Sequence, residues 1–298
     1  MNIARFALPA LLLTLPLQAV AEKVTLEHDG LTLNANVEKS GNWPEGPIVL
    51  MTHGTLAHSG MEIMAALQEL FAENDITSLA INLSLGIDDR EQTMYDCPVT
   101  HTHRHTDALD EISAWAAWLG QQGTTDIVLL GHSRGGNQTA WFAAERAEPL
   151  VTRVILVAPS TWNLDYAVSD YEKRYQTPLS PIVEQARQMV SEGKGAVTLR
   201  NIGFIYCEDT SATAEAVASY YADDPRMNTP TLVAEIEKPV LVIAGSEDNV
   251  VAGLIEAMEP FASRDGVELV VIDGADHFFR DLYAEEVVDV SVDFINAE

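Results

Sequence analysis

The sequence predicts an α/β protein with a mostly parallel central sheet that is covered by helices on both faces. Short, continuous apolar runs of strand length alternate along the chain with segments whose apolar residues recur at helical spacing. Parallel strands buried on both faces have such apolar runs, and the helices between them supply the crossover connections. With 298 residues, 47% of them hydrophobic, the chain is long enough for one large domain with a substantial core.

The folded part is expected to begin with an antiparallel hairpin. Residues 23–39 alternate apolar and polar side chains on both sides of Asp29-Gly30, a dipeptide typical of a tight turn. Further strands are expected at residues 47–54, 76–83, 126–130, 153–159, 239–245 and 267–274. Helices are expected at residues 61–74, 106–119, 134–147, 250–263 and 279–296.

The regular alternation stops between Ser160 and Glu237, and apolar spacing there is mainly helical. Because strands are expected on both sides of this segment, it is interpreted as a cap or lid insertion above the sheet. Six aromatic residues of the insertion are candidates for a substrate pocket, although packing within the cap is expected for most of them. They are Trp162, Tyr166, Phe204, Tyr206, Tyr220 and Tyr221.

The first residues have the pattern of a signal peptide. Arg5 gives a positive start, residues 6–17 are apolar, and residues 19–21 fit a small-x-small cleavage site. The alternative, a membrane anchor helix, is disfavoured because the apolar run is shorter than the ~20 residues of a span and contains Pro9 and Pro16. We expect cleavage after Ala21 and a periplasmic or secreted mature protein, residues 22–298.

The charge balance excludes some classes of partner. The 45 acidic and 17 basic side chains give a formal net charge of -28, which repels nucleic acid and anionic lipid. Stable membrane insertion of the mature chain is not expected, and the sequence does not indicate an oligomeric state. Cys97 and Cys207 are the two cysteines, and they are expected either to form a disulfide in an oxidising compartment or to be separate buried thiols.

A candidate nucleophile lies between a predicted strand and a predicted helix. Residues 131–135, Gly-His-Ser-Arg-Gly, match G-x-S-x-G in the context where this motif forms a nucleophile elbow. Glycines on both sides of Ser133 allow the sharp turn, and the serine would emerge at the carboxyl edge of the sheet. The alternative is a small residue in a structural turn, which the flanking elements disfavour.

A serine hydroxyl needs a base and a group that orients the base. Asp248 and His277 each follow a predicted strand, at the sheet edge where the candidate nucleophile emerges, and the order Ser, Asp, His is typical of this arrangement. Asp248 is preferred as the acid over Glu247, Asp273 and Asp276.

The intermediate of acyl transfer also needs donors for its oxyanion. One is expected to be the backbone N–H of Arg134, at the start of the helix. The second is expected in the glycine-containing segment 52–60, with Thr55 preferred and Leu56 next. His53 is expected to shape the turn rather than react.

These features together resemble an α/β-hydrolase. The resemblance depends on the hairpin, His53-Gly54, residues 131–136, Asp248 and His277, and it covers essentially all of the mature chain. It implies a serine hydrolase with the roles given above and with no cofactor or metal. These motifs are poor guides to the substrate.

Residues 95–107 carry a run of alternating histidines, His101, His103 and His105. Three interpretations remain open: a zinc or copper site, a substrate-facing loop, and a structural loop. Metal binding is disfavoured because structural zinc ligands are usually more widely spaced and no cysteine pair accompanies these histidines.

The sequence thus predicts an exported carboxylesterase that cleaves small or medium acyl esters. An aminopeptidase-like hydrolase is an alternative, with Glu208 and Asp209 as candidate anchors for a substrate amine, as is a thioesterase. A non-enzymatic binding protein on the same fold is a further alternative. The Arg134 side chain could steer an anionic substrate group, but pairing with a nearby carboxylate is expected in so acidic a protein.

Overall fold

The computed structural model describes residues 21–146 and 148–297. The predicted signal peptide, apart from Ala21, lies outside the described residues. In the described part of the chain no helix combines the length and apolar composition needed to cross a membrane.

The central sheet contains eight strands in the order β1-β2-β4-β3-β5-β6-β9-β10. The first two strands form the predicted antiparallel hairpin, β2 and β4 are also antiparallel, and all other neighbouring strands are parallel. The strands are β1 (Glu22–His28), β2 (Leu31–Glu38), β3 (Ile48–Thr52), β4 (Thr77–Asn82), β5 (Ile127–His132), β6 (Val151–Val157), β9 (Val240–Gly245) and β10 (Val267–Ile272). The predicted mostly parallel sheet is confirmed.

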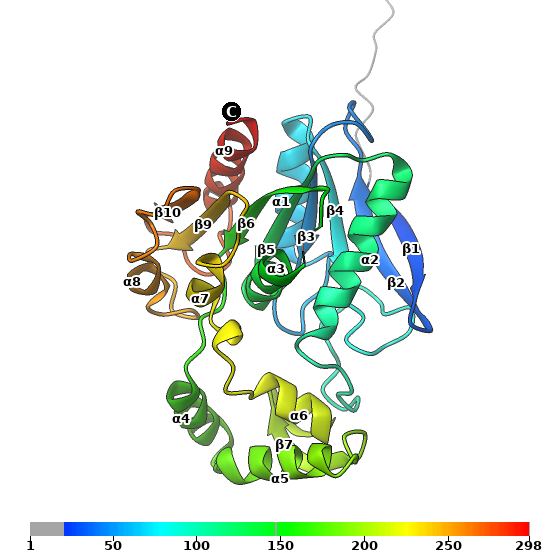
Figure 1. Ribbon diagram of the computed structural model, residues 1–298, viewed down its shortest axis with the longest axis vertical. Helices are drawn as coiled ribbons and strands as arrows, with labels where there is room; N and C mark the ends of the chain where they lie inside the picture. The colour runs from blue at the N-terminus through cyan, green and yellow to red at the C-terminus, as the bar shows by residue number, and fades with distance from the viewer. Residues whose placement is uncertain (1–20, 147, 298) are drawn as a thin grey trace, which may run out of the picture.

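Helices cover both faces of this sheet (Figure 1). On one face lie α2 (Asp107–Gln122), α3 (Arg134–Glu145), α7 (Thr229–Val233) and α8 (Leu254–Met258), and on the other lie α1 (Glu62–Glu73) and α9 (Leu282–Asn296). Each set buries apolar side chains against the strands and forms its own half of the core. Helix α8 is shorter than predicted, because Gly253 precedes it with φ 82° and Pro260 follows it.

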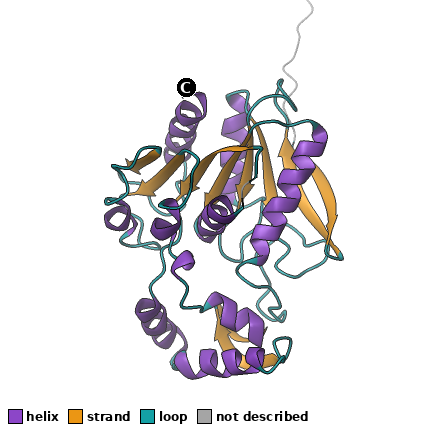
Figure 2. Cartoon of the chain, viewed as in Figure 1, coloured by secondary structure: helices purple, strands orange, loops and turns teal. Residues whose placement is uncertain are grey.

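Between β6 and β9 the chain leaves the sheet and forms a separate layer, hereafter the cap (Figure 2). The cap contains α4 (Leu164–Tyr175), α5 (Ser180–Ser191), β7 (Thr198–Phe204), β8 (Cys207–Thr213) and α6 (Ala214–Tyr220). It has an apolar cluster of its own, while the short helix α7, which follows a 3-10 turn (η1, Pro225–Met227), packs back against α3. The antiparallel pair β7–β8 was not predicted, because its register shifts twice and its residues do not alternate regularly.

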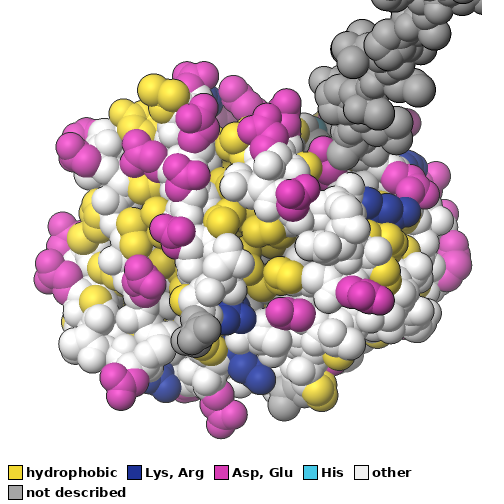
Figure 3. Space-filling view, turned by 90° about the horizontal axis from the view of Figure 1, so that it is seen from above, with side chains coloured by type: hydrophobic (Ala, Val, Ile, Leu, Met, Phe, Trp, Pro, Cys, Tyr) yellow, Lys and Arg dark blue, Asp and Glu magenta, His cyan; other side chains and the backbone are white. Residues whose placement is uncertain are grey.

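Acidic side chains are spread over the face opposite the cap, with few Lys or Arg among them (Figure 3). This distribution agrees with the net charge of -28.

Candidate active site

Ser133 lies at the sharp turn between β5 and α3. Its backbone has φ 58° and ψ -124°, a strained conformation for a residue with a side chain. A Cβ at Gly135 would meet the backbone oxygens of Thr52 and His53, and a Cβ at Gly131 would lie 2.5 Å from the Gly135 oxygen. Only glycine fits at these two positions, so the motif produces the elbow for a steric reason.

The structure brings Ser133, His277 and Asp248 together. Ser133 Oγ lies 3.0 Å from His277 Nε2, and His277 Nδ1 lies 2.8 Å from Asp248 Oδ2. The backbone N–H groups of Val250 and Val251 donate to Asp248 Oδ1, at 2.7 and 2.9 Å. Burial raises the pKa of the Asp248 carboxyl, but the bonds from His277 and the backbone outweigh burial and hold it below its ordinary value.

Two of the three alternative carboxylates are engaged elsewhere. Asp276 pairs with Arg280 at 3.1 Å, and Asp273 accepts a hydrogen bond from Ser246. The sequence left these positions open because all of them follow the ends of β9 or β10.

Two buried histidines support the site without lying in the triad. His132 Nε2 donates to the backbone oxygen of His277 at 2.9 Å, and burial lowers the His132 pKa to about 4, so its ring is neutral at pH 7. His53 Nδ1 donates to the Gly54 oxygen at 2.9 Å, and its Nε2 accepts from the Leu83 N–H at 3.1 Å. Burial lowers the His53 pKa to about 3. His53 therefore lies at the turn as a neutral structural group.

The turn after β3 passes directly beside Ser133. A Cβ at Gly54 would lie 3.1 Å from the Ser133 Cβ, so a glycine allows this close approach. Among the described residues, no group accepts a hydrogen bond from the backbone N–H of Thr55 or of Arg134. Both N–H groups are available to a ligand at Ser133.

A cavity of about 440 Å³ opens in front of Ser133. Residues of the main domain form one side of it, and residues of the cap form the other. Five of the six candidate aromatic residues line it, whereas Phe204 is fully buried in the cap cluster. The five are Trp162, Tyr166, Tyr206, Tyr220 and Tyr221.

The structure also places in the cavity wall residues that sequence reasoning missed, among them Asn137 and Met227. Asn137 lies one turn beyond the nucleophile on α3, a spacing that could have indicated its exposure to the site. Met227 comes from the segment that rejoins the main domain, and nothing in its local sequence indicates this position. Glu208 and Asp209, the candidate anchors of the aminopeptidase-like alternative, do not line the cavity, which disfavours that role for them.

The side chain of Arg134 lines the cavity without a carboxylate partner among the described residues. Its Nε donates to Thr55 Oγ1 at 3.0 Å, Nη1 donates to His105 Nδ1 at 3.4 Å, and its Cζ lies 5.2 Å from the centre of the Tyr220 ring. The expectation that Arg134 pairs with a nearby carboxylate is therefore wrong. The carboxylate in the cavity wall, Asp170, pairs with Arg174 at 3.1 Å.

The three histidines of the run are buried between the main domain and the cap. His101 Nδ1 lies 3.2 Å from His103 Nε2, and His103 Nδ1 lies 2.8 Å from the Tyr220 hydroxyl. His105 Nε2 lies 2.9 Å from Asn137 Oδ1. In the described part of the chain no group of three or more His, Cys, Asp or Glu side chains could hold a metal ion. The run packs as structure, and its last member also reaches the cavity.

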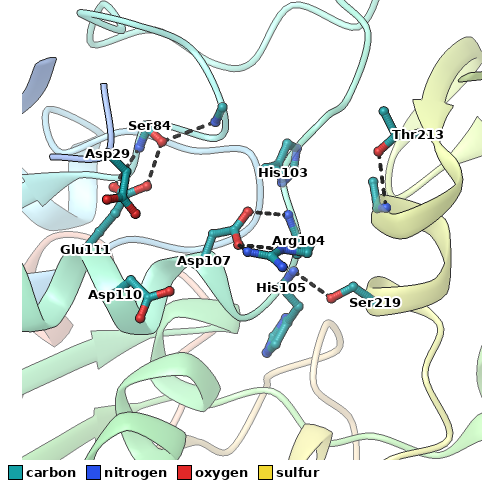
Figure 4. A network of polar contacts seen from close by, with 12 residues as sticks. Asp29, Ser84, His103, Arg104, His105, Asp107, Asp110, Glu111, Thr213 and Ser219 are labelled. Atoms are coloured by element: carbon teal, nitrogen blue, oxygen red, sulfur yellow. Dashed lines mark hydrogen bonds and ion pairs between the residues drawn. The ribbon is translucent and has the colours of Figure 1, made fainter. Parts of the chain in front are cut away.

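The loop of residues 95–107, which contains the histidine run, also links one side of the cap to the main domain. A disulfide joins Cys97 to Cys207, with 5.3 Å between their Cα atoms. The His101 N–H donates to the Ser211 oxygen at 2.8 Å, and the His105 N–H donates to Ser219 Oγ at 3.0 Å. Figure 4 shows the bond from His105 to Ser219 on α6.

The sequence of this chain matches the alpha/beta hydrolase family over residues 49–290. The chain belongs to the alpha/beta hydrolase family. It is thus a hydrolase of that family, and the fold and family predicted from the sequence are both confirmed.

Within this family, the chain is similar to 2-(acetamidomethylene)succinate hydrolase of Mesorhizobium japonicum, with 23% identity over 89% of this chain and 92% of that protein. It is similar in structure to Est1E from Butyrivibrio proteoclasticus, with a TM-score of 0.61 and 22% identity over 92% of this chain and 99% of that one. The monoacylglycerol lipase of Paleococcus ferrophilus has a TM-score of 0.60 and 18% identity over 88% of this chain and 98% of that one. At these identities the structural likenesses show the fold.

Proposed function

We propose that this hydrolase is a serine carboxylesterase that cleaves small or medium acyl esters through an acyl-serine intermediate. The observation that carries the proposal is the 3.0 Å distance between Ser133 Oγ and His277 Nε2, at the wall of a cavity that can hold a substrate. The bond from His277 Nδ1 to Asp248 orients the imidazole so that Nε2 can accept the serine proton.

In the first half-reaction Ser133 Oγ attacks the ester carbonyl carbon, and its proton moves to His277 Nε2. Asp248 stabilises the imidazolium that forms, and the backbone N–H groups of Thr55 and Arg134 bind the oxyanion. The tetrahedral intermediate collapses when its bond to the alcohol oxygen breaks and His277 returns the proton to that oxygen. In the second half-reaction water attacks the acyl-serine with His277 as the base, which releases the acid and restores Ser133.

The cavity supports a small or medium substrate. Its volume of about 440 Å³ lies in the lower part of the range of small-molecule sites, roughly 300–1,000 Å³. The name of the monoacylglycerol lipase among the similar structures also favours ester hydrolysis. A binding protein without activity would not need the alignment of three side chains at hydrogen-bond distance.

We propose further that the protein is exported and that residues 1–21 are removed as a signal peptide. The disulfide between Cys97 and Cys207 supports an oxidising compartment, since such bonds are rare in the cytosol. N-terminal sequencing of the protein recovered from the periplasm and the medium tests this, and an intact Met1 in the recovered protein would contradict it.

The catalytic proposal is tested with p-nitrophenyl esters from acetate to palmitate. We expect wild-type protein to turn over the shorter esters and to be labelled by a fluorophosphonate at Ser133. Ser133→Ala should lose both turnover and label, while Ser191→Ala, at an exposed serine on α5, should keep both. Absence of turnover and label in folded wild-type protein would refute the proposal.

A further inference from the structure

We infer that the substrate of this hydrolase carries a carboxylate group and that the guanidinium of Arg134 binds it beside Ser133. The inference rests on the proposed function and adds the chemical class of the substrate.

Several N–H groups of the Arg134 guanidinium have no acceptor among the described residues. Two of its five N–H groups donate, one to Thr55 Oγ1 and one to His105 Nδ1, which leaves three without an acceptor in residues 21–146 and 148–297. The side chain lines the same cavity as Ser133, the preceding residue. A planar fork of N–H groups matches a carboxylate, which can accept two parallel hydrogen bonds from it.

The groups that hold Arg134 are all neutral. His105 Nε2 donates to Asn137 Oδ1 at 2.9 Å, so Nδ1 is left as the acceptor for Arg134. Burial, with the Arg134 charge as a smaller cause, lowers the pKa of His105 to about 3, so its ring is uncharged. The third contact is the face of the Tyr220 ring. These contacts fix the orientation of the guanidinium without supplying a counter-charge.

The charge balance of the cavity wall is therefore positive. Among the described residues, the charged side chains of this wall are Arg134, Asp170 and Arg174, and the last two pair with each other. The cavity thus has one uncompensated positive charge in a chain whose net charge is -28.

Other arginines of the described chain find their acceptors in two ways. Arg104, Arg146 and Arg226 each form an ion pair with an aspartate at 2.7 Å. Arg90 is buried without an ion pair, but both of its terminal nitrogens donate to backbone oxygens. Arg134 differs from both kinds, because neither a carboxylate nor a backbone oxygen of the described residues accepts from it and it lies beside the nucleophile. A partly buried guanidinium without a counter-ion loses solvation and gains no ion pair, and a bound carboxylate would restore that balance. An unpaired guanidinium next to the nucleophile therefore favours substrates that carry a carboxylate.

The competing interpretation is structural: Arg134 holds Thr55, and so positions its N–H for the oxyanion. Both roles predict that loss of Arg134 lowers activity. They differ in whether the loss depends on the charge of the substrate, so the test compares esters that have the same shape and differ in charge.

Two matched pairs place the carboxylate in either half of the ester. Monoethyl glutarate is compared with ethyl 5-methylhexanoate, and acetoxyacetate with isobutyl acetate. In each pair an isopropyl group replaces the carboxylate. Wild type, Arg134→Met and Thr55→Val are assayed with all four.

We expect wild type to have the higher kcat/KM for the anionic member of at least one pair. The selectivity ratio is the kcat/KM of the anionic ester divided by the kcat/KM of its neutral partner. Arg134→Met should lower this selectivity ratio at least about tenfold, as expected for the loss of a charge-assisted hydrogen bond. Thr55→Val removes the contact of Arg134 with Thr55 Oγ1 and keeps both the backbone N–H and the guanidinium, so it should lower turnover of both members equally. If the selectivity ratio were the same in wild type and Arg134→Met, with neutral esters still cleaved, the inference would be overturned and the proposed function would remain supported.

Calorimetry with Ser133→Ala gives a readout that needs no turnover. We expect this variant to bind the anionic ester of at least one pair more tightly than its neutral partner, and the further change Arg134→Met to abolish that difference. Equal or absent binding of the two members in both pairs would overturn the inference. If the wild type neither cleaves esters nor accepts the fluorophosphonate, the proposed function fails, and selective binding to Ser133→Ala still decides whether Arg134 recognises the carboxylate.

Discussion

Glu111, a buried carboxyl group on α2, is expected to make the stability of this protein fall as pH rises. Its Oε1 accepts from Ser84 Oγ at 2.6 Å and its Oε2 accepts from the Ser84 N–H at 2.9 Å, as Figure 4 shows. Burial raises the pKa of Glu111 to about 7, although both bonds from Ser84 oppose the shift.

The direction of this pH dependence follows from the pKa of Glu111 in the folded and in the unfolded chain. In the unfolded chain Glu111 releases its proton near its ordinary pKa of 4.5, whereas the folded protein holds it up to about pH 7. The folded state is therefore favoured fully below pH 4.5 and loses stability as pH rises from 4.5 to 7, with no further change above. A shift of about 2.5 pKa units corresponds to a loss of roughly 3 kcal/mol across that window.

Glu111→Gln removes this ionisation and keeps the shape of the side chain. The amide oxygen can accept from the Ser84 N–H, and the amide nitrogen can donate to Ser84 Oγ. We expect the variant to match wild type at pH 4.5 and to exceed it by up to about 3 kcal/mol at pH 8, measured by urea unfolding across this range.

Asp110→Asn is the matched control, because Asp110 is the adjacent carboxyl on α2 and lies at the surface in a pair with Arg146. It should keep the pH dependence of the wild type. If Glu111→Gln were less stable than wild type at pH 8, the ionised carboxylate would be stabilising in the folded state, and the reasoning from burial would be refuted.

Three further variants test the triad, the turn at Ser133 and the disulfide of the cap. Asp248→Asn should keep the fold, checked by circular dichroism, and lower kcat for the cleaved ester about 10⁴-fold, because the asparagine no longer holds the base in the right tautomer; a loss under tenfold would contradict this. Gly135→Ala should fail to give a folded, fluorophosphonate-reactive protein, since its Cβ would meet backbone oxygens of β3 and His53; a normal thermal unfolding midpoint would contradict it. Replacing Cys97 and Cys207 together by alanine removes a link across 110 residues and should lower the free energy of unfolding by about 4 kcal/mol in urea titrations; an unchanged midpoint would mean that other cap contacts suffice.

The elbow could be predicted from the sequence because its causes are local. The glycines at 131 and 135 and the serine between them lie within five residues, and the strand and helix beside them have clear periodicities. The same is true of the hairpin at Asp29-Gly30. Asp248 and His277 could be named because each follows a strand, and parallel strands end at one edge of the sheet.

The features that the sequence could not predict depend on distant contacts. Arg134 was expected to find a carboxylate, but its neighbours come from Thr55, His105 and Tyr220, which are 79, 29 and 86 residues away. The β7–β8 pair could not be predicted because its own residues do not alternate regularly, and β8 also bonds to a distant loop of the main domain: the Thr213 N–H donates to the His101 oxygen at 2.9 Å.

The buried histidine run accounts for the uncompensated charge of Arg134. Five of the six ring nitrogens of the run contact one another, the Tyr220 hydroxyl, Asn137 or Arg134, while His101 Nε2 is buried without a partner among the described residues. The described residues offer no group of three or more side chains for a metal. Burial lowers the pKa of His101 to about 4 and keeps all three rings neutral at pH 7. A rigid, uncharged wall is thus built behind the guanidinium. Because that wall neither neutralises nor repels Arg134, the positive charge beside Ser133 remains available to a substrate carboxylate.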